Sequence, residues 1–140
     1  MEKIIALIGA LLLLSACTQE AVVYDTMKNI SASGKSLKCT WSRPELTGVA
    51  WVVGNHTRTE TRFANKIHVT IDDGRNKHIW TMWQRQGTNI SSAYYPLLEK
   101  MMGVKVNNTY YCKEKQVSAS RFSLPAYVKF KYIKPEIVMI

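Results

Sequence analysis

The strongest constraint on the fold is a change in spacing at Leu37, after which apolar and polar residues alternate along much of the chain. Alternation with a period of two is typical of strands, because successive side chains point to opposite faces of a sheet. Turn-forming residues separate the alternating runs, as expected for short connections between antiparallel strands. Strands are therefore predicted over residues 37–42, 48–53, 57–63, 66–71, 78–83 and 127–133.

Two segments have helical spacing instead, residues 24–33 and residues 93–102, with apolar side chains at every third or fourth position. The second helix is expected to cover one face of the sheet. Residues 84–92 are predicted to form a polar loop, and residues 121–125 an extended segment. The predicted fold class is α+β, mainly β, with an antiparallel meander covered by one or two short helices.

The start of the chain has the layout of a secretory signal, with a charged beginning, an apolar run of eleven residues and small residues before Cys17. Its ending, Leu14-Ser15-Ala16-Cys17, resembles a bacterial lipobox, in which cleavage precedes a cysteine that receives lipid. The apolar run is shorter than the ~20 residues of a membrane-spanning helix. An ordinary secretory signal cleaved after Ala16 and an uncleaved anchor are the alternatives.

The expected organisation follows from this signal: a lipoprotein signal peptide at 1–16, a tether at 17–23, a single β-rich domain at 24–134 and a C-terminal tail at 135–140. We expect the protein to be anchored to a membrane by a lipid attached to Cys17. The expected location is the cell envelope, on a periplasmic or cell-surface face.

The three cysteines divide into one plus two. If Cys17 carries lipid, Cys39 and Cys112 remain, and an oxidising compartment favours a disulfide between them. In the chain-entropy model, a disulfide that closes so long a loop raises the free energy of unfolding by about 4 kcal/mol. A catalytic or metal-bound cysteine is the alternative, although neither residue has a CxxC spacing or an adjacent histidine.

The formal net charge of +9 favours contact with anionic lipids, acidic glycans or other polyanions. A nucleic-acid partner is not expected, because the predicted location is outside the cytoplasm and no run of Lys and Arg exceeds two residues. The candidate basic face consists of Arg58, Arg62 and Lys66. Dispersed, solvated charges that protect strand edges are the simpler interpretation.

Large apolar side chains on the predicted strands and covering helix are candidates for the lining of a ligand cavity, since such sites are concave and mostly apolar. An ordinary hydrophobic core is the alternative. The candidate lining residues are Trp51, Trp80, Met82, Leu97 and Met101.

No motif for catalysis or for a cofactor is present: HExxH, GxSxG, CxxC and a glycine-rich dinucleotide fingerprint are all absent. His68 and His78 flank the expected Asp72-Asp73-Gly74 turn, but no third ligand for a metal accompanies them. We therefore expect neither an enzyme nor a cofactor nor a metal, with a hydrolase as the alternative.

Scattered glycine, aromatic and cysteine positions form a recognisable pattern: Gly48-x-x-Trp51-Val52-x-Gly54-Asn55-x-x-Arg58-x-Glu60, Ile71-Asp72-x-Gly74, Cys112 and Phe122-x-x-Pro125-x-x-Val128-x-Phe130. This pattern resembles a group of small prokaryotic lipoproteins, which in turn look distantly like the lipoprotein-carrier superfamily of LolA, LolB and LppX. The resemblance implies a strongly curved sheet, a half-barrel-like meander, with an apolar cavity that holds lipid or acyl chains.

Residue chemistry and resemblance together predict a membrane-anchored, extracytoplasmic, non-enzymatic binding domain for a lipid or another apolar ligand. The alternative is a structural or adhesive surface lipoprotein that contacts polyanions through its basic face.

Overall fold

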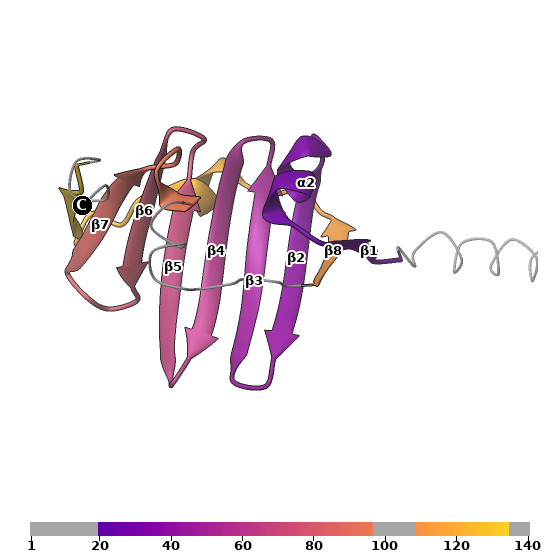
Figure 1. Ribbon diagram of the computed structural model, residues 1–140, viewed down its shortest axis with the longest axis horizontal. Helices are drawn as coiled ribbons and strands as arrows, with labels where there is room; N and C mark the ends of the chain where they lie inside the picture. The colour runs from indigo at the N-terminus through magenta and orange to yellow at the C-terminus, as the bar shows by residue number, and fades with distance from the viewer. Residues whose placement is uncertain (1–19, 97–108, 135–140) are drawn as a thin grey trace, which may run out of the picture.

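The computed structural model describes residues 20–96 and 109–134, and it is mainly β, as predicted. Its strands form a nine-stranded sheet that does not close, in the order β1-β8-β2-β3-β4-β5-β6-β7-β9 (Figure 1). A short helix, α2 (Met27–Ala32), and a 3-10 turn, η1 (Ala119–Phe122), accompany it. The strands are β1 (Val22–Tyr24), β2 (Ser36–Arg43), β3 (Leu46–Val53), β4 (His56–Phe63), β5 (Lys66–Asp72), β6 (Asn76–Thr81), β7 (Gln86–Ser91), β8 (Tyr110–Glu114) and β9 (Lys129–Tyr132).

Strands β2 to β7 form the meander, each pairing antiparallel with the next. Two later strands extend its edges: β8 pairs with β2 and also carries β1, whereas β9 pairs in parallel with β7. The meander therefore includes β7, which lies outside the strands predicted from the sequence. The sheet is mixed only at its β7–β9 edge.

Two sequence predictions for the middle of the chain are wrong. The strand predicted over 78–83 ends at Thr81, and Trp83 lies in the following turn with a positive φ of 73°. The polar loop predicted over 84–92 contains strand β7. Its polar side chains are compatible with a strand because hydrogen bonds to β6 and β9 satisfy its backbone groups on both sides.

The other predicted segments differ at their ends. The helix predicted over 24–33 is shorter, because Tyr24 pairs with Tyr110 in the sheet and the Thr26 hydroxyl caps α2 by accepting a hydrogen bond from the Asn29 N–H at 3.1 Å. The segment predicted as extended over 121–125 begins inside η1. The helix predicted over 93–102 falls largely outside the described residues.

The turn between β5 and β6 is built by side chains that accept hydrogen bonds from the backbone. The Asp73 carboxylate accepts from the N–H groups of Arg75 and Asn76, both at 2.8 Å. The hydrogen bond from Asn76 is the main reason that the pKa of Asp73 lies below its ordinary value. The expected Asp72-Asp73-Gly74 turn is confirmed, with Gly74 at a φ of 90°.

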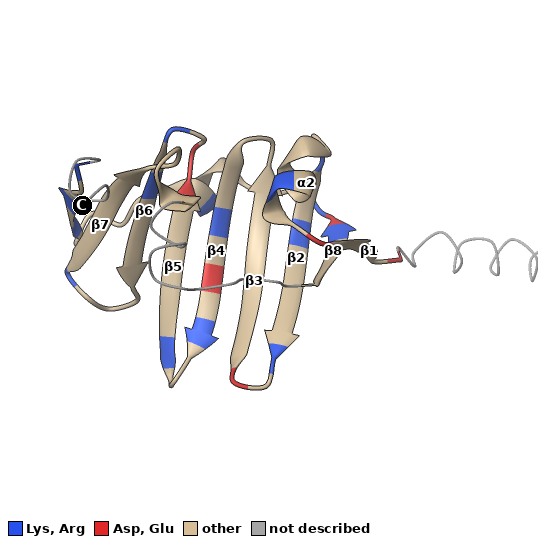
Figure 2. Cartoon of the chain, viewed as in Figure 1, with Lys and Arg blue, Asp and Glu red and all other residues tan. Residues whose placement is uncertain are grey.

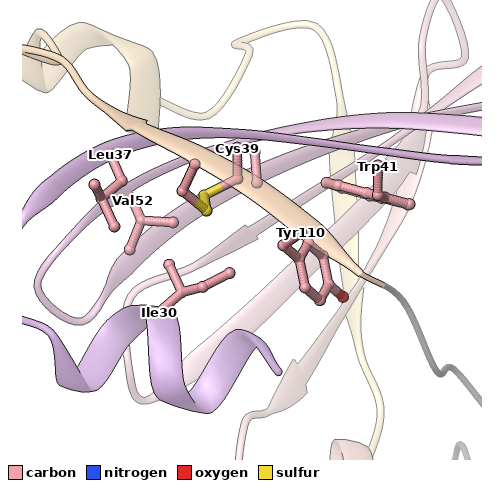
Figure 3. Close-up of a cluster of buried hydrophobic side chains, with 8 residues drawn as sticks. Ile30, Leu37, Cys39, Trp41, Val52 and Tyr110 are labelled. Atoms are coloured by element: carbon pink, nitrogen blue, oxygen red, sulfur yellow. A yellow bond between two sulfur atoms is a disulfide. The ribbon is translucent and has the colours of Figure 1, made fainter. Parts of the chain in front are cut away.

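The hydrophobic core is divided between the two faces of the sheet. On the face that α2 covers, which we call the α2 face, the buried cluster lies over β8, β2 and β3. Figure 3 shows Ile30 of α2 pointing toward Val52 and toward the disulfide between β2 and β8. The buried members of this cluster are Ile30, Leu37, Cys39, Trp41, Ala50, Val52, Tyr110 and Cys112.

The second cluster lies on the opposite face, which we call the η1 face. Val69 and Trp80 are directly opposite each other on β5 and β6, and the register places both on the side away from Ala50 and α2. The chain from η1 to β9 covers them, with the Phe130 ring centre 5.6 Å from that of Trp80. The buried members are Val69, Ile71, Trp80 and Val128.

The predicted disulfide is confirmed. Cys39 of β2 and Cys112 of β8 are directly opposite in the ladder, their Cα atoms lie 4.0 Å apart, and 73 positions separate them in the sequence. Both side chains are fully buried at the centre of the α2-face cluster (Figure 3). The bond therefore fixes β8, a strand late in the chain, against the first long strand.

Candidate functional site

Three of the candidate cavity residues lie on the η1 face, and the chain itself covers two of them. Trp51 and Trp80 are only 7% and 5% exposed. The guanidinium carbon of Arg121 lies 4.2 Å from the Trp51 ring centre, and Phe130 packs against Trp80. Met82 packs against the same cluster. These residues are therefore core or near-core side chains of the η1 face.

The remaining cavity candidates, Leu97 and Met101, lie outside the described residues. The cavity between the sheet and residues 93–102 therefore stays a prediction. A separate open cleft of about 530 Å³ lies beside β7 and β9. Its described lining residues are Gln86, Gly87, Thr88, Lys129, Phe130 and Lys131.

The three residues of the predicted basic face do not share one face. Arg58 and Arg62 lie on the η1 face, whereas Lys66 lies on the α2 face, because Arg62 is paired with Ile67 rather than with Lys66. Arg58 is also partly neutralised, since its guanidinium forms an ion pair with Glu60 at 2.8 Å. It donates a further hydrogen bond to the Arg121 carbonyl at 3.3 Å.

A different group of cations gathers on the η1 face around Trp51. Lys38 lies directly opposite Trp51, with its ammonium nitrogen 6.0 Å from the ring centre, and Arg121 stacks on the same ring. Lys113 of the neighbouring strand β8 lies directly opposite Lys38, on the same face. We call Lys38, Lys113 and Arg121 the cation cluster. Figure 2 shows the excess of Lys and Arg over Asp and Glu along these strands.

The cation cluster lacks acidic partners within the described residues. In this part of the chain ion pairs join Lys35 to Glu114, Arg58 to Glu60 and Lys77 to Asp72, and none includes a member of the cluster. Like charges directly opposite each other in a sheet destabilise it. The Lys38–Lys113 pair therefore opposes folding locally unless an anion lies between the two ammonium groups.

The sequence contained a signal for this cluster that the prediction did not use. If Cys39 is bonded to Cys112 within an antiparallel ladder, the residue before Cys39 must face the residue after Cys112. That rule pairs Lys38 with Lys113, as observed. No such signal predicts the contact between Arg121 and Trp51, because it depends on where η1 lies over the sheet.

The histidines do not form a metal site. His68 and His78 lie on opposite faces of the sheet, because His78 is paired with Ile71 and not with His68. The His68 ring nitrogen Nδ1 contacts the Thr81 hydroxyl at 3.1 Å, and the His78 ring packs edge-on against Phe130. Over residues 20–96 and 109–134, no three metal-binding side chains gather in one place.

Fold and site together define a small open β-sheet domain with a cationic patch on one face. Comparison with protein-family models, with curated proteins and with solved structures finds no match to this chain. In the described part of the chain, no helix combines the length and apolar character needed to cross a membrane.

Proposed function

We propose that this protein is a lipid-anchored, non-enzymatic domain of the cell envelope that binds polyanions through its cation cluster. The observation that carries the proposal is a set of three cations without acidic partners in the described structure: Lys38 and Arg121 at the Trp51 ring, and Lys113 opposite Lys38. The lipobox-like ending at Cys17 and the resemblance to small lipoproteins support the anchor and the compartment.

The arrangement suits an anion in two respects. An oxyanion between Lys38 and Lys113 would replace their mutual repulsion by two attractions. Arg121 adds a planar guanidinium that forms paired hydrogen bonds with sulfate or phosphate, and its stacking on Trp51 holds that group in place. Arg58 lies directly opposite Trp51, and Glu60 balances its charge.

Reversing one charge tests the proposal because stability and binding should change in opposite directions. Lys113→Glu turns a repulsive cross-strand pair into an attractive one, so the free energy of unfolding should rise by about 0.5 kcal/mol. Binding to a sulfated polysaccharide at low salt should weaken by about tenfold. Urea unfolding and calorimetric titration of the full chain measure the two effects.

Lys28→Glu in α2 is the matched control, since it makes the same change in net charge at an exposed position on the other face. It should leave most of the binding intact. Equal loss of binding in both variants, or binding that does not weaken with salt, would show that only net charge matters and would refute the proposed site.

A second candidate function is binding of an amphiphilic lipid, as the resemblance to lipoprotein carriers implies. The observation that favours it is the cleft beside β7 and β9, whose volume of about 530 Å³ is typical of ligand sites. Phe130 gives this cleft an aromatic surface, and Lys129 and Lys131 supply charges that would pair with an acidic headgroup.

Native mass spectrometry of protein extracted from membranes tests this candidate. We expect a non-covalent mass in addition to any lipid attached to Cys17, released by collisional activation. Gly87→Val should abolish it, because a side chain there would meet the Phe130 ring at 2.6 Å and displace it. Protein that is free of bound lipid in the wild type would count against the candidate.

A further inference from the structure

Two neighbouring turns at one end of the sheet present aromatic and cationic side chains to solvent. The first joins β4 to β5, and the second follows β6 beside it, since the Met82 N–H donates to the Ile67 carbonyl at 2.8 Å and so continues the β5–β6 pairing. Five exposed side chains lie in or beside these two turns, and we call them the turn rim: Arg62, Phe63, Lys66, Trp83 and Arg85.

Trp83 is the most unusual residue of the turn rim. It is 84% exposed, and its φ of 73° lies in the left-handed region, which a bulky side chain adopts at a cost. The other three tryptophans, Trp41, Trp51 and Trp80, are at most 7% exposed. Neither burial nor backbone preference accounts for tryptophan at position 83, where glycine or asparagine would fit the turn better.

The charges of the turn rim point to an anionic partner. Residues 62–66 and 82–85 contain no aspartate or glutamate, and they include the cations Arg62, Lys66 and Arg85. The acidic residue nearest in the order of turns at this end is Glu45 between β2 and β3, whereas the turn between β5 and β6, at the opposite end of the sheet, carries both acidic and basic residues (Figure 2). The charged residues of the turn rim are therefore all cations.

A lipid on Cys17 would place the domain beside a bilayer. The tether does not itself point the rim at the membrane, because β1 is parallel to β2 and the chain before Val22 leads toward the other end of the sheet, where Glu20 and Glu114 line one cleft. Docking of the rim is therefore attributed to its own aromatic and cationic side chains.

We propose that the turn rim docks on the surface of an anionic lipid bilayer, with Trp83 and Phe63 in the interfacial region and the three cations against lipid headgroups. Tryptophan prefers the membrane–water interface because its ring is amphipathic. Each Lys or Arg near an anionic surface adds an attraction of its own. This proposal rests on the proposed lipid anchor only for the presence of a bilayer nearby, whereas the polyanion site is a different one, on the η1 face over β8, β2 and β3.

The test uses the full chain, purified in detergent and reconstituted into vesicles of phosphatidylcholine with or without phosphatidylglycerol. Brominated phospholipids quench tryptophan that enters the bilayer, and Trp83 is the one highly exposed tryptophan among the four. We expect quenching in phosphatidylglycerol vesicles that Trp83→Gly abolishes. The same variant should unfold at a higher denaturant concentration, because glycine relieves the positive φ.

Charge variants add a graded readout. Neutralising Lys66 or Arg85 by glutamine should shift the ratio of docked to undocked protein about fivefold per residue in phosphatidylglycerol vesicles. Vesicles of phosphatidylcholine alone should show much less docking of the wild type. Equal quenching in the two kinds of vesicle would overturn the electrostatic part of the proposal.

A relocated tryptophan is the matched control. Trp83→Phe combined with Val53→Trp moves the reporter to the opposite end of β3, where Val53 is 37% exposed, and should escape quenching. Equal quenching of the relocated tryptophan would overturn the proposal. It would also be overturned if lipid did not quench Trp83 but soluble acrylamide could not reach it, because that result indicates that a second copy of the chain covers Trp83. Lys113→Glu should keep lipid quenching while its polysaccharide binding weakens about tenfold, so the two proposals fail separately.

Discussion

Replacing Cys39 and Cys112 together by alanine is expected to lower the free energy of unfolding by about 4 kcal/mol. The bond closes a loop with a sequence separation of 73, so its loss greatly increases the conformational freedom of the unfolded chain. Both sulfur atoms also lie inside the α2-face cluster, and their removal leaves space beside Val52 and Ile30.

Urea unfolding of the wild type with and without reductant, compared with the double variant, measures this effect. Reductant should bring the wild type close to the variant and should leave the variant unchanged. A loss below about 1 kcal/mol would mean that β8 is held by its ladder and by Tyr110 without help from the bond.

Gly48→Val is expected to destabilise the domain by about 3 kcal/mol or more. Trp41 lies directly opposite Gly48, and a Cβ at position 48 would overlap atoms of the indole ring. The ring has little room to move, because it is 6% exposed and packs edge-on against Tyr110 with ring centres 5.2 Å apart. The glycine is therefore required by the close approach of Trp41.

Thr47→Val is the matched control, since Thr47 is the exposed neighbour of Gly48 and points to the opposite face. It should change the free energy of unfolding by less than about 0.5 kcal/mol. Combining Gly48→Ala with Trp41→Leu should cost less than the sum of the single changes, because a smaller partner accommodates the new methyl group. Additive losses would contradict a direct clash.

The alternating runs predicted the central strands because their burial is one-sided. Leu37, Cys39 and Trp41 face α2 while the residues between them face the other side, so a period of two is visible in the sequence. Strand β7 was missed because its residues are mostly polar, and its pairing with β6 and β9 is not encoded in an apolar pattern. Trp83 was placed in a strand because an apolar residue next to Met82 looks buried.

The site was harder to predict than the fold because it combines residues from β2, β8 and η1. Lys38 and Lys113 become neighbours only through the Cys39–Cys112 register. Arg121 reaches Trp51 only because η1 returns across the sheet. The candidate face of Arg58, Arg62 and Lys66 followed sequence proximity, but the register of β4 and β5 sends Lys66 to the other side.

The division of the core has a consequence for cooperativity. The disulfide and α2 secure β8, β2 and β3 from one side, whereas β5, β6 and β9 depend on the segment that follows η1 on the other side. Among the described residues the two buried clusters share no member, and the α2 face between them carries threonines such as Thr59 and Thr70. Local opening events can therefore begin in the half that lacks a covalent crosslink while the other half stays folded, so amide protons of β6 and β7 exchange with solvent sooner than those of β2 and β3.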